Sequence, residues 1–427
     1  MRIVYFNEKN DIIDKIVNRG EIEFEKFYNS INQIINEVKN RKDKAIIDFT
    51  EKFDNFKLNE NNYFFDKNDF EKAYNSISKE LKEALNFAAD RIKKYHEKQK
   101  KNSWIATEEN GIIIGQKFTP IERIGIYVPG GKALYPSTLL MTAIPAKVAD
   151  VKEIFVTCPV FEFEKALPVL AAAHISGVDK IFKIGGAQSI AALAFGTDWF
   201  PKVYKIVGPG NIYVAMAKKI LFGIIDIDMF AGPSEILIIS DGSVNPEYVA
   251  NDLLSQAEHD ELASAILITH NEDFAKKVKK IIDEEIKKSP RKDILENSIK
   301  NYSVIIIVNN LDKAVDIANE VAPEHLEILT DKPFSILGKV KNAGAIFLGK
   351  YSPEPIGDYV AGTNHVLPTG GTAKFFSPLS VDDFIKKSSI VYVPETAYSQ
   401  LSKNAKIIAK EEGLIHHHNS LEVRDEG

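Results

Sequence analysis

The chain has 427 residues, 44% of them hydrophobic and 27% charged, and its formal net charge is −6 at pH 7. This composition is typical of a folded enzyme with two or three domains and excludes a mini-protein or a disordered chain. Mild acidity argues against nucleic acid and against a membrane surface as partners, because neither polyanion would attract the whole molecule. We therefore expect a small-molecule partner.

Cysteine content and hydropathy indicate the cellular compartment in which the protein is expected. A single cysteine, Cys158, excludes an intrachain disulfide and a cysteine-rich zinc site, which favours a reducing compartment, by default the cytoplasm. The N-terminus has only four apolar residues in a row, too few for a signal peptide. The longest aliphatic run, residues 304–308, is far below the roughly 20 residues that cross a bilayer.

The expected elements change in character along the chain. The first hundred residues are charged and helical, and from Ser78 apolar residues recur every three or four positions, the period of one helix face. Short β-rich runs then alternate with helical stretches, which predicts parallel sheets covered by helices in two α/β units. The expected strands are 124–128, 154–158, 180–184, 203–207, 236–239, 265–269, 304–308, 325–330 and 344–348.

Three of these strands run directly into glycine turns that precede helices. The turns are Pro129-Gly130-Gly131, Gly185-Gly186 and Gly208-Pro209-Gly210. Glycine lets backbone N–H groups and a helix N-terminus approach an anion, so a pyrophosphate would fit across these strand ends. Neither the G-x-G-x-x-G fingerprint nor a P-loop is present. A purely structural role, in which glycine supplies backbone freedom, therefore stays open.

Two polar residues share one face of the helix expected at residues 249–259. Gln256 and His259 lie three positions apart near its C-terminal end, opposite the apolar positions. An amide oxygen and an imidazole nitrogen suit a divalent cation of zinc type, although glutamine is an uncommon ligand. The alternative is a solvated polar face whose histidine interacts with the helix terminus.

Acid–base candidates follow a helix that stops at Pro323. Glu324 and His325 stand at the mouth of the next strand, and the ends of parallel strands are where catalytic groups collect. An adjacent carboxylate and imidazole can divide proton transfer and water activation at neutral pH. A later polar loop adds Asp358, which either completes a metal site or holds a turn. Loop polarity without function remains the alternative for the pair.

The tail and the cysteine leave further alternatives. Glu412 precedes three histidines, His416 to His418, which form a metal clamp or occur by chance; residues 421–424 continue as strand-like sequence. Such a tail serves a site only by reaching back over its own surface or into a neighbouring subunit. Cys158 ends a strand, where it is either a nucleophile or a buried small hydrophobe.

Seven motifs occur in order along most of the chain: Tyr127-Val-Pro-Gly-Gly131, Gly186-Ala-Gln188 through Gly196, Gly208-Pro-Gly-Asn211, Ala231-Gly-Pro-Ser234-Glu235, Leu254-Ser-Gln256-Ala-Glu-His259, Ala322-Pro-Glu324-His325, and Gly357-Asp358 through His365-Val-Leu-Pro368. Together they resemble the histidinol dehydrogenase family, the zinc- and NAD-dependent enzymes of the last two steps of histidine biosynthesis.

The resemblance implies a role for each candidate residue. It implies a zinc site made by Gln256, His259, Asp358 and the partner subunit's His417. It implies NAD contacts from Tyr127, Gln188 and Asn211, and proton chemistry by Glu324 and His325. The implied substrate-binding residues are Ser234, Gln256, His259, His325, Asp358, Glu412 and His417. The family spacing from Glu412 selects His417 as the tail ligand, yet His416 and His418 flank it, so a shift of one residue would choose a neighbour.

The resemblance also implies a fold: two incomplete Rossmann-like α/β domains with parallel sheets and small helical terminal segments, in an intertwined homodimer. The expected divisions are an N-terminal arm over 1–20, a discontinuous α/β domain over 21–126 and 236–378 with most zinc and acid–base residues, an NAD domain over 127–235, and a C-terminal tail domain over 379–427 that reaches the partner subunit.

The implied chemistry is the oxidation of L-histidinol to L-histidine through bound L-histidinaldehyde. It removes four electrons, so two NAD⁺ each accept one hydride while zinc anchors the substrate. Without the resemblance, two other enzymes fit the residues: an aldehyde dehydrogenase that uses Cys158 covalently, and a zinc-dependent hydrolase whose glycine turns are only structural. A non-catalytic nucleotide-binding module fits least, because many titratable residues gather in the polar loops.

Overall fold

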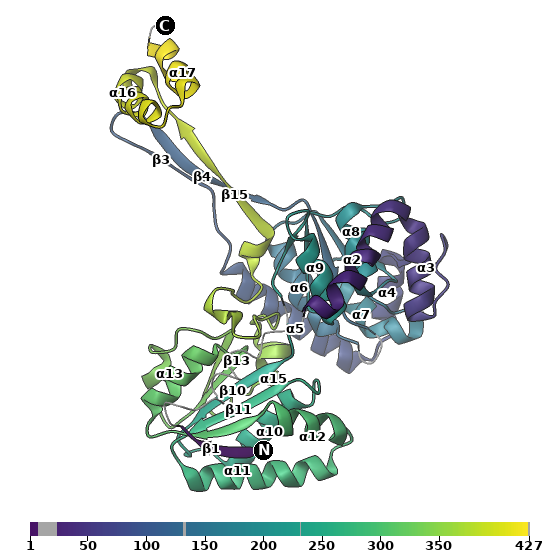
Figure 1. Cartoon of the computed structure of the whole chain (residues 1–427). Coiled ribbons are helices and arrows are strands. Elements are labelled where there is room, and N and C mark those ends of the chain that lie inside the picture. The colour runs from purple at the N-terminus through teal and green to yellow at the C-terminus, as the bar shows by residue number, and fades with distance from the viewer. Residues whose placement is uncertain (7–23, 131–133, 231, 426–427) are drawn as a thin grey trace. The chain divides into compact units, whose positions relative to one another are not determined.

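The computed structural model describes residues 1–6, 24–130, 134–230 and 232–425 (Figure 1). It divides into two compact units: Met1–Gln99 with Ile121–Phe384, and Lys100–Pro120 with the chain after Phe384. Most of the arm expected over 1–20, and Gly131 of the first glycine turn, lie outside the described residues. Among the described helices none is both long and apolar enough to cross a membrane.

The first sheet carries the three glycine turns. Its six strands run in the order β2-β7-β6-β5-β8-β9, parallel except where β2 meets β7. They are β2 (Phe64–Phe65), β5 (Arg123–Tyr127), β6 (Glu153–Thr157), β7 (Lys180–Phe182), β8 (Lys205–Val207) and β9 (Asp226–Ile227). The helices between them are α6 (Pro136–Val148), α7 (Phe163–Ser176), α8 (Gly186–Phe195) and α9 (Ile212–Leu221). Each strand expected here is present within a few residues of its predicted bounds.

Four N-terminal helices pack onto this first sheet: α2 (Phe24–Arg41), α3 (Asp43–Asp54), α4 (Lys67–Ser76) and α5 (Lys79–Glu97). Ile31, Val38 and Ile46 share one buried core with Phe182 and Ile190. The domain division expected from the sequence, which groups residues 21–126 with 236–378, stays a prediction. Periodicity identifies which face of a helix is apolar, but it does not say which sheet covers that face.

The second sheet is parallel throughout, in the order β1-β12-β11-β10-β13-β14. Its strands are β1 (Arg2–Tyr5), β10 (Glu235–Ser240), β11 (Ser264–Thr269), β12 (Val304–Ile307), β13 (His325–Leu329) and β14 (Ala345–Leu348). Helices α10 (Pro246–Ala257), α11 (Glu272–Glu285) and α12 (Lys292–Asn301) cover one face; α13 (Leu311–Val321) and α14 (Phe334–Leu337) cover the other.

The apolar runs of the second sheet explain this two-sided cover. Ile236 and Ile238 face the α10 side, whereas Leu237 and Ile239 face the α13 side. Because successive side chains of a strand point to opposite faces, a continuous aliphatic run must be buried on both. The structure therefore confirms the expected α/β class with two sheets of mainly parallel strands.

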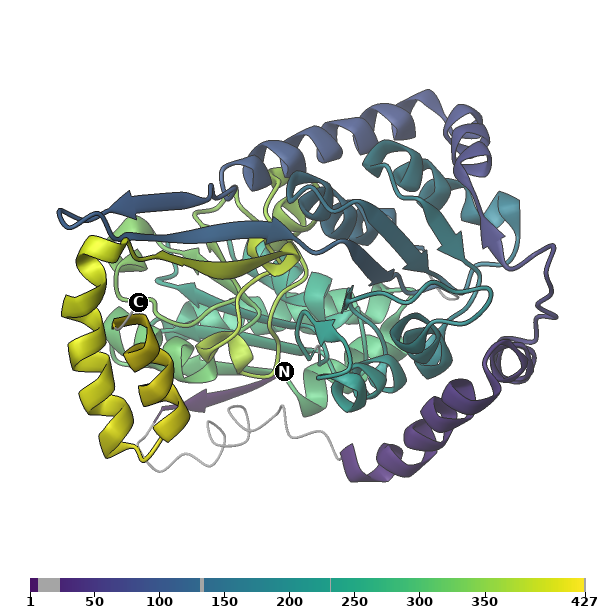
Figure 2. The same ribbon diagram turned by 90° about the horizontal axis from the view of Figure 1, so that it is seen from above.

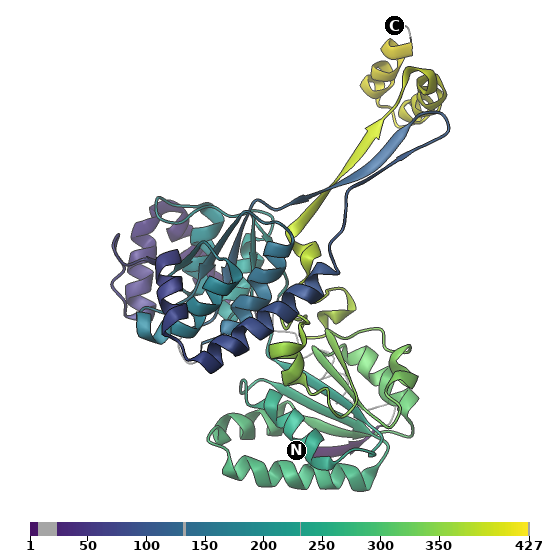
Figure 3. The same ribbon diagram turned by 180° about the vertical axis from the view of Figure 1, so that it is seen from behind.

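The second compact unit, Lys100–Pro120 with the chain after Phe384, consists of an antiparallel ribbon and two helices. Strands β3 (Trp104–Thr107), β4 (Ile113–Pro120) and β15 (Ile385–Tyr392) form an antiparallel ribbon, which Figure 3 shows as one continuous sheet. Helices α16 (Glu395–Glu411) and α17 (Ile415–Asp425) pack against each other, side by side in Figure 2. The prediction of a strand at residues 421–424 was wrong, because four residues of mixed polarity do not distinguish a strand from a helix face.

Candidate active site

Glu324 and His325 lie at the start of β13 in a buried polar cluster. The His325 Nδ1 donates to the Glu235 carbonyl oxygen over 2.9 Å, since a carbonyl only accepts. On the other side of the ring, Nε2 is 3.4 Å from Asp358 Oδ1, and Nδ1 is also 3.6 Å from Glu324 Oε2. Both Glu324 and His325 are buried. Two carboxylates and one imidazole are thus confined where water is scarce.

Strand pairing and one special backbone conformation place these groups. Helix α13 ends at Ala322, whose φ of 49° is uncommon for a non-glycine residue and turns the chain toward Pro323. In the parallel pairing of β10 with β13, Ile236 stands opposite His325, so the Glu235 N–H donates to Glu324 Oε2 over 2.8 Å. The backbone of one strand therefore orients the acid and the imidazole of the next.

The cluster occupies the amino edge of the second sheet. The sequence placed Glu324 and His325 at a strand end, and the structure specifies that end as the start of β13. Helix α10 runs back from the carboxyl edge of β10 and ends at Ala257, before β11 begins, so Gln256 and His259 arrive at the same edge. Ser234, just before β10, joins them: the His259 Nδ1 is 3.4 Å from the Ser234 Oγ. Three separate motifs thus meet.

The ionisable groups of the cluster shift one another's pKa. Burial opposes a charged His325 ring, but Glu324 and Asp358 outweigh burial and raise the pKa of His325. Burial also opposes the Asp358 carboxylate, yet hydrogen bonding and attraction from His325 hold its pKa well below its usual range. Burial raises the pKa of Glu324, and His325 offsets this only in part. Each of the three groups thus shifts the pKa of at least one of the others, an arrangement that suits proton transfer.

Gln256 is a buried donor of an unusual kind. It is 1% exposed, and its Oε1 has no hydrogen-bond partner among the described residues. The neighbouring His259 is accessible to solvent, but partial desolvation lowers its pKa, while the negative charge of Asp358 acts in the opposite direction. A buried amide oxygen without a partner is costly, so it marks a position where another group is expected to bind.

Sequence reasoning missed Glu354. It begins α15 (Glu354–Ile356), directly before the short helix η2 (Gly357–Ala361), and its carboxyl oxygen lies within 4.8 Å of ligand atoms of His325 and Asp358. Its backbone N–H donates to Glu327 Oε1 over 2.7 Å, and its Oε2 accepts from Ser255 over 3.3 Å. The available signal was its spacing, four residues before Asp358, which places both on one helix face.

The three glycine turns gather at the carboxyl edge of the first sheet. Tyr127 ends β5 and is buried, with its hydroxyl 3.5 Å from the Gly186 N–H. Gln188, in the first turn of α8, is also buried. Asn211 is exposed and caps α9, accepting from the backbone N–H groups of Tyr213 and Val214 over 3.1 and 3.2 Å. Strands β5 and β8 are neighbours and β7 is separated from β5 only by β6, so the three residues predicted to contact NAD end or follow strands of one sheet at the same edge.

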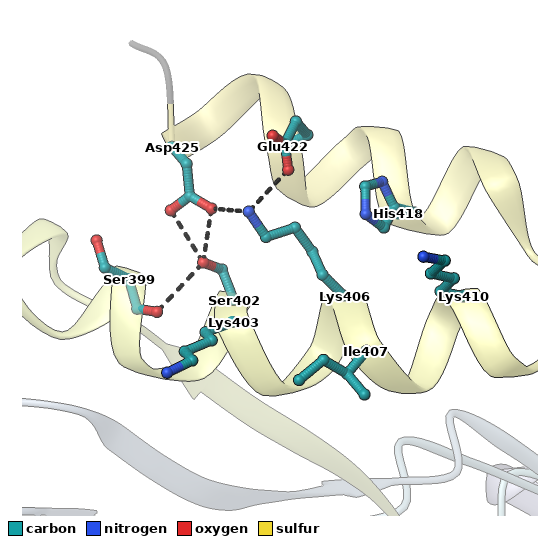
Figure 4. A pocket seen from close by; sticks show the side chains of 9 residues that line it. All are labelled: Ser399, Ser402, Lys403, Lys406, Ile407, Lys410, His418, Glu422 and Asp425. Carbon is teal, nitrogen blue, oxygen red and sulfur yellow. Dashed lines mark hydrogen bonds and ion pairs between the residues drawn. The ribbon is translucent and has the colours of Figure 1, made fainter.

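Glu412 and His417 belong to the second unit, at the end of α16 and on α17. Figure 4 shows a groove between these helices, in which Lys406 bonds to Asp425 and Glu422, each over 2.7 Å. These bonds raise the pKa of Lys406, so it stays charged and fastens α17 to α16. His418 lines the groove, whereas His416 and His417 are exposed. Exposure leaves His416 and His417 available to a site elsewhere.

Comparison with known proteins supports this reading of the motifs. The family model for histidinol dehydrogenase matches residues 17–425. The chain belongs to the histidinol dehydrogenase family. A histidinol dehydrogenase of Aquifex aeolicus is 50% identical over 415 residues, covering 97% of this chain and 96% of the relative. One of Syntrophotalea carbinolica is 48% identical over 426 residues, covering 99% of each. The crystal structure of histidinol dehydrogenase from Elizabethkingia anophelis is 36% identical, with a TM-score of 0.93 over 100% of this chain and 98% of that one.

Membership of the histidinol dehydrogenase family makes this protein an oxidoreductase, which disfavours the hydrolase alternative. The thiol alternative meets a physical obstacle. Cys158 is fully buried, and burial raises the pKa of its thiol to about 12, whereas an attacking cysteine must form a thiolate. The Cys158 side chain therefore belongs to the core of the first sheet.

We expect the Cys158 thiol to be unreactive in the native protein. Dithiobis-nitrobenzoate should label it only when guanidinium unfolds the chain, and Cys158→Ala should keep wild-type turnover within about twofold because packing changes of this size are modest. Fast labelling of the native protein together with loss of activity would restore the covalent mechanism.

Proposed function

We propose that this protein oxidises L-histidinol to L-histidine through bound L-histidinaldehyde, with NAD⁺ as oxidant and zinc as substrate anchor, in the last two steps of histidine biosynthesis. The supporting observation is the buried cluster of Glu324, His325 and Asp358 at the sheet edge that Gln256 also reaches, where Gln256 Oε1 has no partner among the described residues. Confined carboxylates and an imidazole suit repeated proton transfer, and the nearby N and O donors suit a zinc ion.

Gln256, His259 and Asp358 would hold the metal, with the partner subunit's His417 as fourth ligand. The donor set fits zinc because it combines imidazole nitrogens with amide and carboxylate oxygens, and because Gln256 Oε1 has no partner among the described residues. Bound zinc would supply a Lewis acid that fixes the amino and imidazole groups of the substrate. We assign His325 to proton transfer because its Nδ1 is already engaged by Glu235.

Tyr127, Gln188 and Asn211 would contact NAD at the carboxyl edge of the first sheet. Packing requires glycine in these turns: a Cβ on Gly185 would stand 2.9 Å from Pro159, and one on Gly208 would stand 2.2 Å from the Tyr127 carbonyl oxygen. In addition, Gly185 gives α8 no side-chain cap, so its first N–H groups are available to an anion. Bound NAD⁺ would supply the hydride acceptor for each oxidation.

The chain's own residues would carry the protons. In its neutral form His325 would accept the hydroxyl proton of the alcohol at Nε2 in the first oxidation, and Glu324 in its carboxylate form would take a proton from the water that adds to the aldehyde carbon. His325 would then accept the hydroxyl proton of the hydrated aldehyde in the second oxidation. Ser234 and Glu412 would help to hold the substrate, and the buried position of the cluster would keep the aldehyde from escaping.

The separate role of Glu324 predicts a split between the half-reactions. Glu324→Gln should slow oxidation of L-histidinaldehyde by about 10²–10⁴, because a general base is lost. The first NADH formed from L-histidinol in a single turnover should stay within about tenfold of wild type, since His325 remains. Stopped-flow absorbance at the NADH band measures both steps.

Glu327→Gln is the matched control for Glu324→Gln. Glu327 lies on β13, the strand that directly follows Glu324, and is also buried, but its carboxyl contacts the Glu354 backbone. We expect this substitution to change both half-reactions by the same factor. Equal slowing of both half-reactions by Glu324→Gln would show that Glu324 does not activate water.

We also propose a homodimer in which each tail completes the site of the other subunit. The second unit supports this, because α16 and α17 expose Ile407, Ile408, Ile415 and Val423, each between 57% and 62% accessible, and the ribbon exposes Ile105 and Val391. So many exposed apolar side chains in one small unit favour an interaction surface. A second copy of the chain would cover them and would receive His417.

Shared sites predict rescue in hybrid dimers. His259→Ala and His417→Ala should each lose zinc and activity as homodimers. Random mixing of the two should restore about one quarter of the sites, because half of the dimers are hybrids and each hybrid has one intact site. Zinc content and NADH formation measure the rescue. If the mixture has no more zinc or activity than the mean of the two parent homodimers, the metal is held within one chain. Repeating the experiment with His416→Ala or His418→Ala in place of His417→Ala would identify which histidine is the ligand.

A further inference from the structure

A buried ion pair holds the glycine turn that follows β8. Lys218 of α9 and Asp228, just after β9, form a direct ion pair with side chains only 3% and 1% exposed. The Lys218 Nζ also donates to the Gly208 carbonyl oxygen over 3.1 Å. The Gly208 N–H donates to Asp228 Oδ2 over 2.7 Å. Both backbone groups of one glycine are therefore fixed by one pair of charges.

Gly208 has no freedom to move away from this pair. Its φ is 108°, in the region that favours glycine, and an added Cβ would stand 2.2 Å from the Tyr127 carbonyl oxygen. The turn is thus fitted between β5 on one side and the ion pair on the other. Three residues later Asn211 caps α9, the helix that carries Lys218. A shift of the pair would move Gly208 and Asn211 together.

Stability is a poor explanation for this arrangement. Removing two charges from water costs several kcal/mol per ion, and replacing a buried pair by apolar side chains is often neutral or stabilising. What the pair supplies here is geometry, because each charge binds one backbone atom of the same residue at hydrogen-bond distance. That residue belongs to a turn proposed to contact a dinucleotide.

The opposite end of β8 provides a contrasting pair. Lys205 is 4% exposed and pairs with Asp226 over 3.0 Å and with Asp383 over 3.6 Å. It begins β8, whereas the glycine turn follows the end of that strand. Two buried lysine ion pairs therefore stand at the two ends of one short strand, and only Lys218 contacts a glycine turn among the described residues.

We propose that Lys218 and Asp228 are positioning residues for NAD, which fix the Gly208–Asn211 backbone in the conformation that the dinucleotide binds. The inference rests on the proposed NAD dependence and extends it to two residues that do not themselves contact the cofactor. Their loss should weaken dinucleotide binding and leave the histidinol cluster, on the second sheet, unchanged.

The test uses the full-length protein and the variant K218M/D228N, which removes both charges and leaves no unpaired ion. NADH binding, followed by its fluorescence, should weaken about tenfold or more, with a parallel rise in KM for NAD⁺. The KM for L-histidinol should stay within about twofold because its site is separate. Lys218→Arg keeps the positive charge but moves the donating nitrogen, so it should weaken NADH binding about threefold. This single variant replaces the double variant in the test if the double variant does not fold.

Lys205→Met is the matched control. It should lower the thermal unfolding midpoint, because it leaves acidic partners unpaired, while NADH affinity stays within about twofold of wild type. Unchanged NADH affinity in folded K218M/D228N or in K218R would overturn the positioning role, as would equal weakening by Lys205→Met. Wild-type protein that binds no NADH would instead refute the proposed NAD dependence itself.

Discussion

The parallel register of β10 against β13 is the constraint on which the site depends. Because Ile236 stands opposite His325, the Glu235 backbone offers its carbonyl oxygen to the His325 ring and its N–H to the Glu324 carboxyl. Any other register would separate these groups and leave buried polar atoms without partners, at a cost of about 1–3 kcal/mol each. The long aliphatic runs that drive sheet formation thereby also hold the Glu324 carboxylate and the His325 ring 3.6 Å apart.

Two opposite sheet edges serve the proposed chemistry. The first sheet presents glycine turns at its carboxyl edge, the usual place for nucleotide sites in open α/β sheets. The second sheet presents its titratable residues at its amino edge, where Glu235, His325 and the end of α10 come together. Backbone amides of a glycine turn suit a pyrophosphate, whereas side chains confined at strand starts suit proton transfer and metal binding. Under the proposed function, this division would assign the cofactor and the substrate to different α/β sheets.

Much of the fold could be predicted from the sequence, for identifiable reasons. Aliphatic runs such as 304–308 have to be buried on both faces, so strands and the parallel class followed directly. The packing of α2 and α3 onto the first sheet could not be predicted, because the apolar pattern of a helix does not identify the element against which that face packs. Neither could the ribbon of β3, β4 and β15, whose pairing joins segments far apart in the chain. Likewise the motifs indicated Glu324 and His325, but the contact of Glu354 with them depends on tertiary structure.

The central claim is that a metal-assisted four-electron oxidation occurs in this cluster. The most direct measurement counts NADH formed per L-histidinol consumed by the metal-replete protein with excess NAD⁺, with and without a chelator. The account predicts two NADH per L-histidinol, loss of activity on chelation, and recovery with zinc. No NADH would contradict the account outright, and one NADH with release of the aldehyde would contradict the proposed second oxidation.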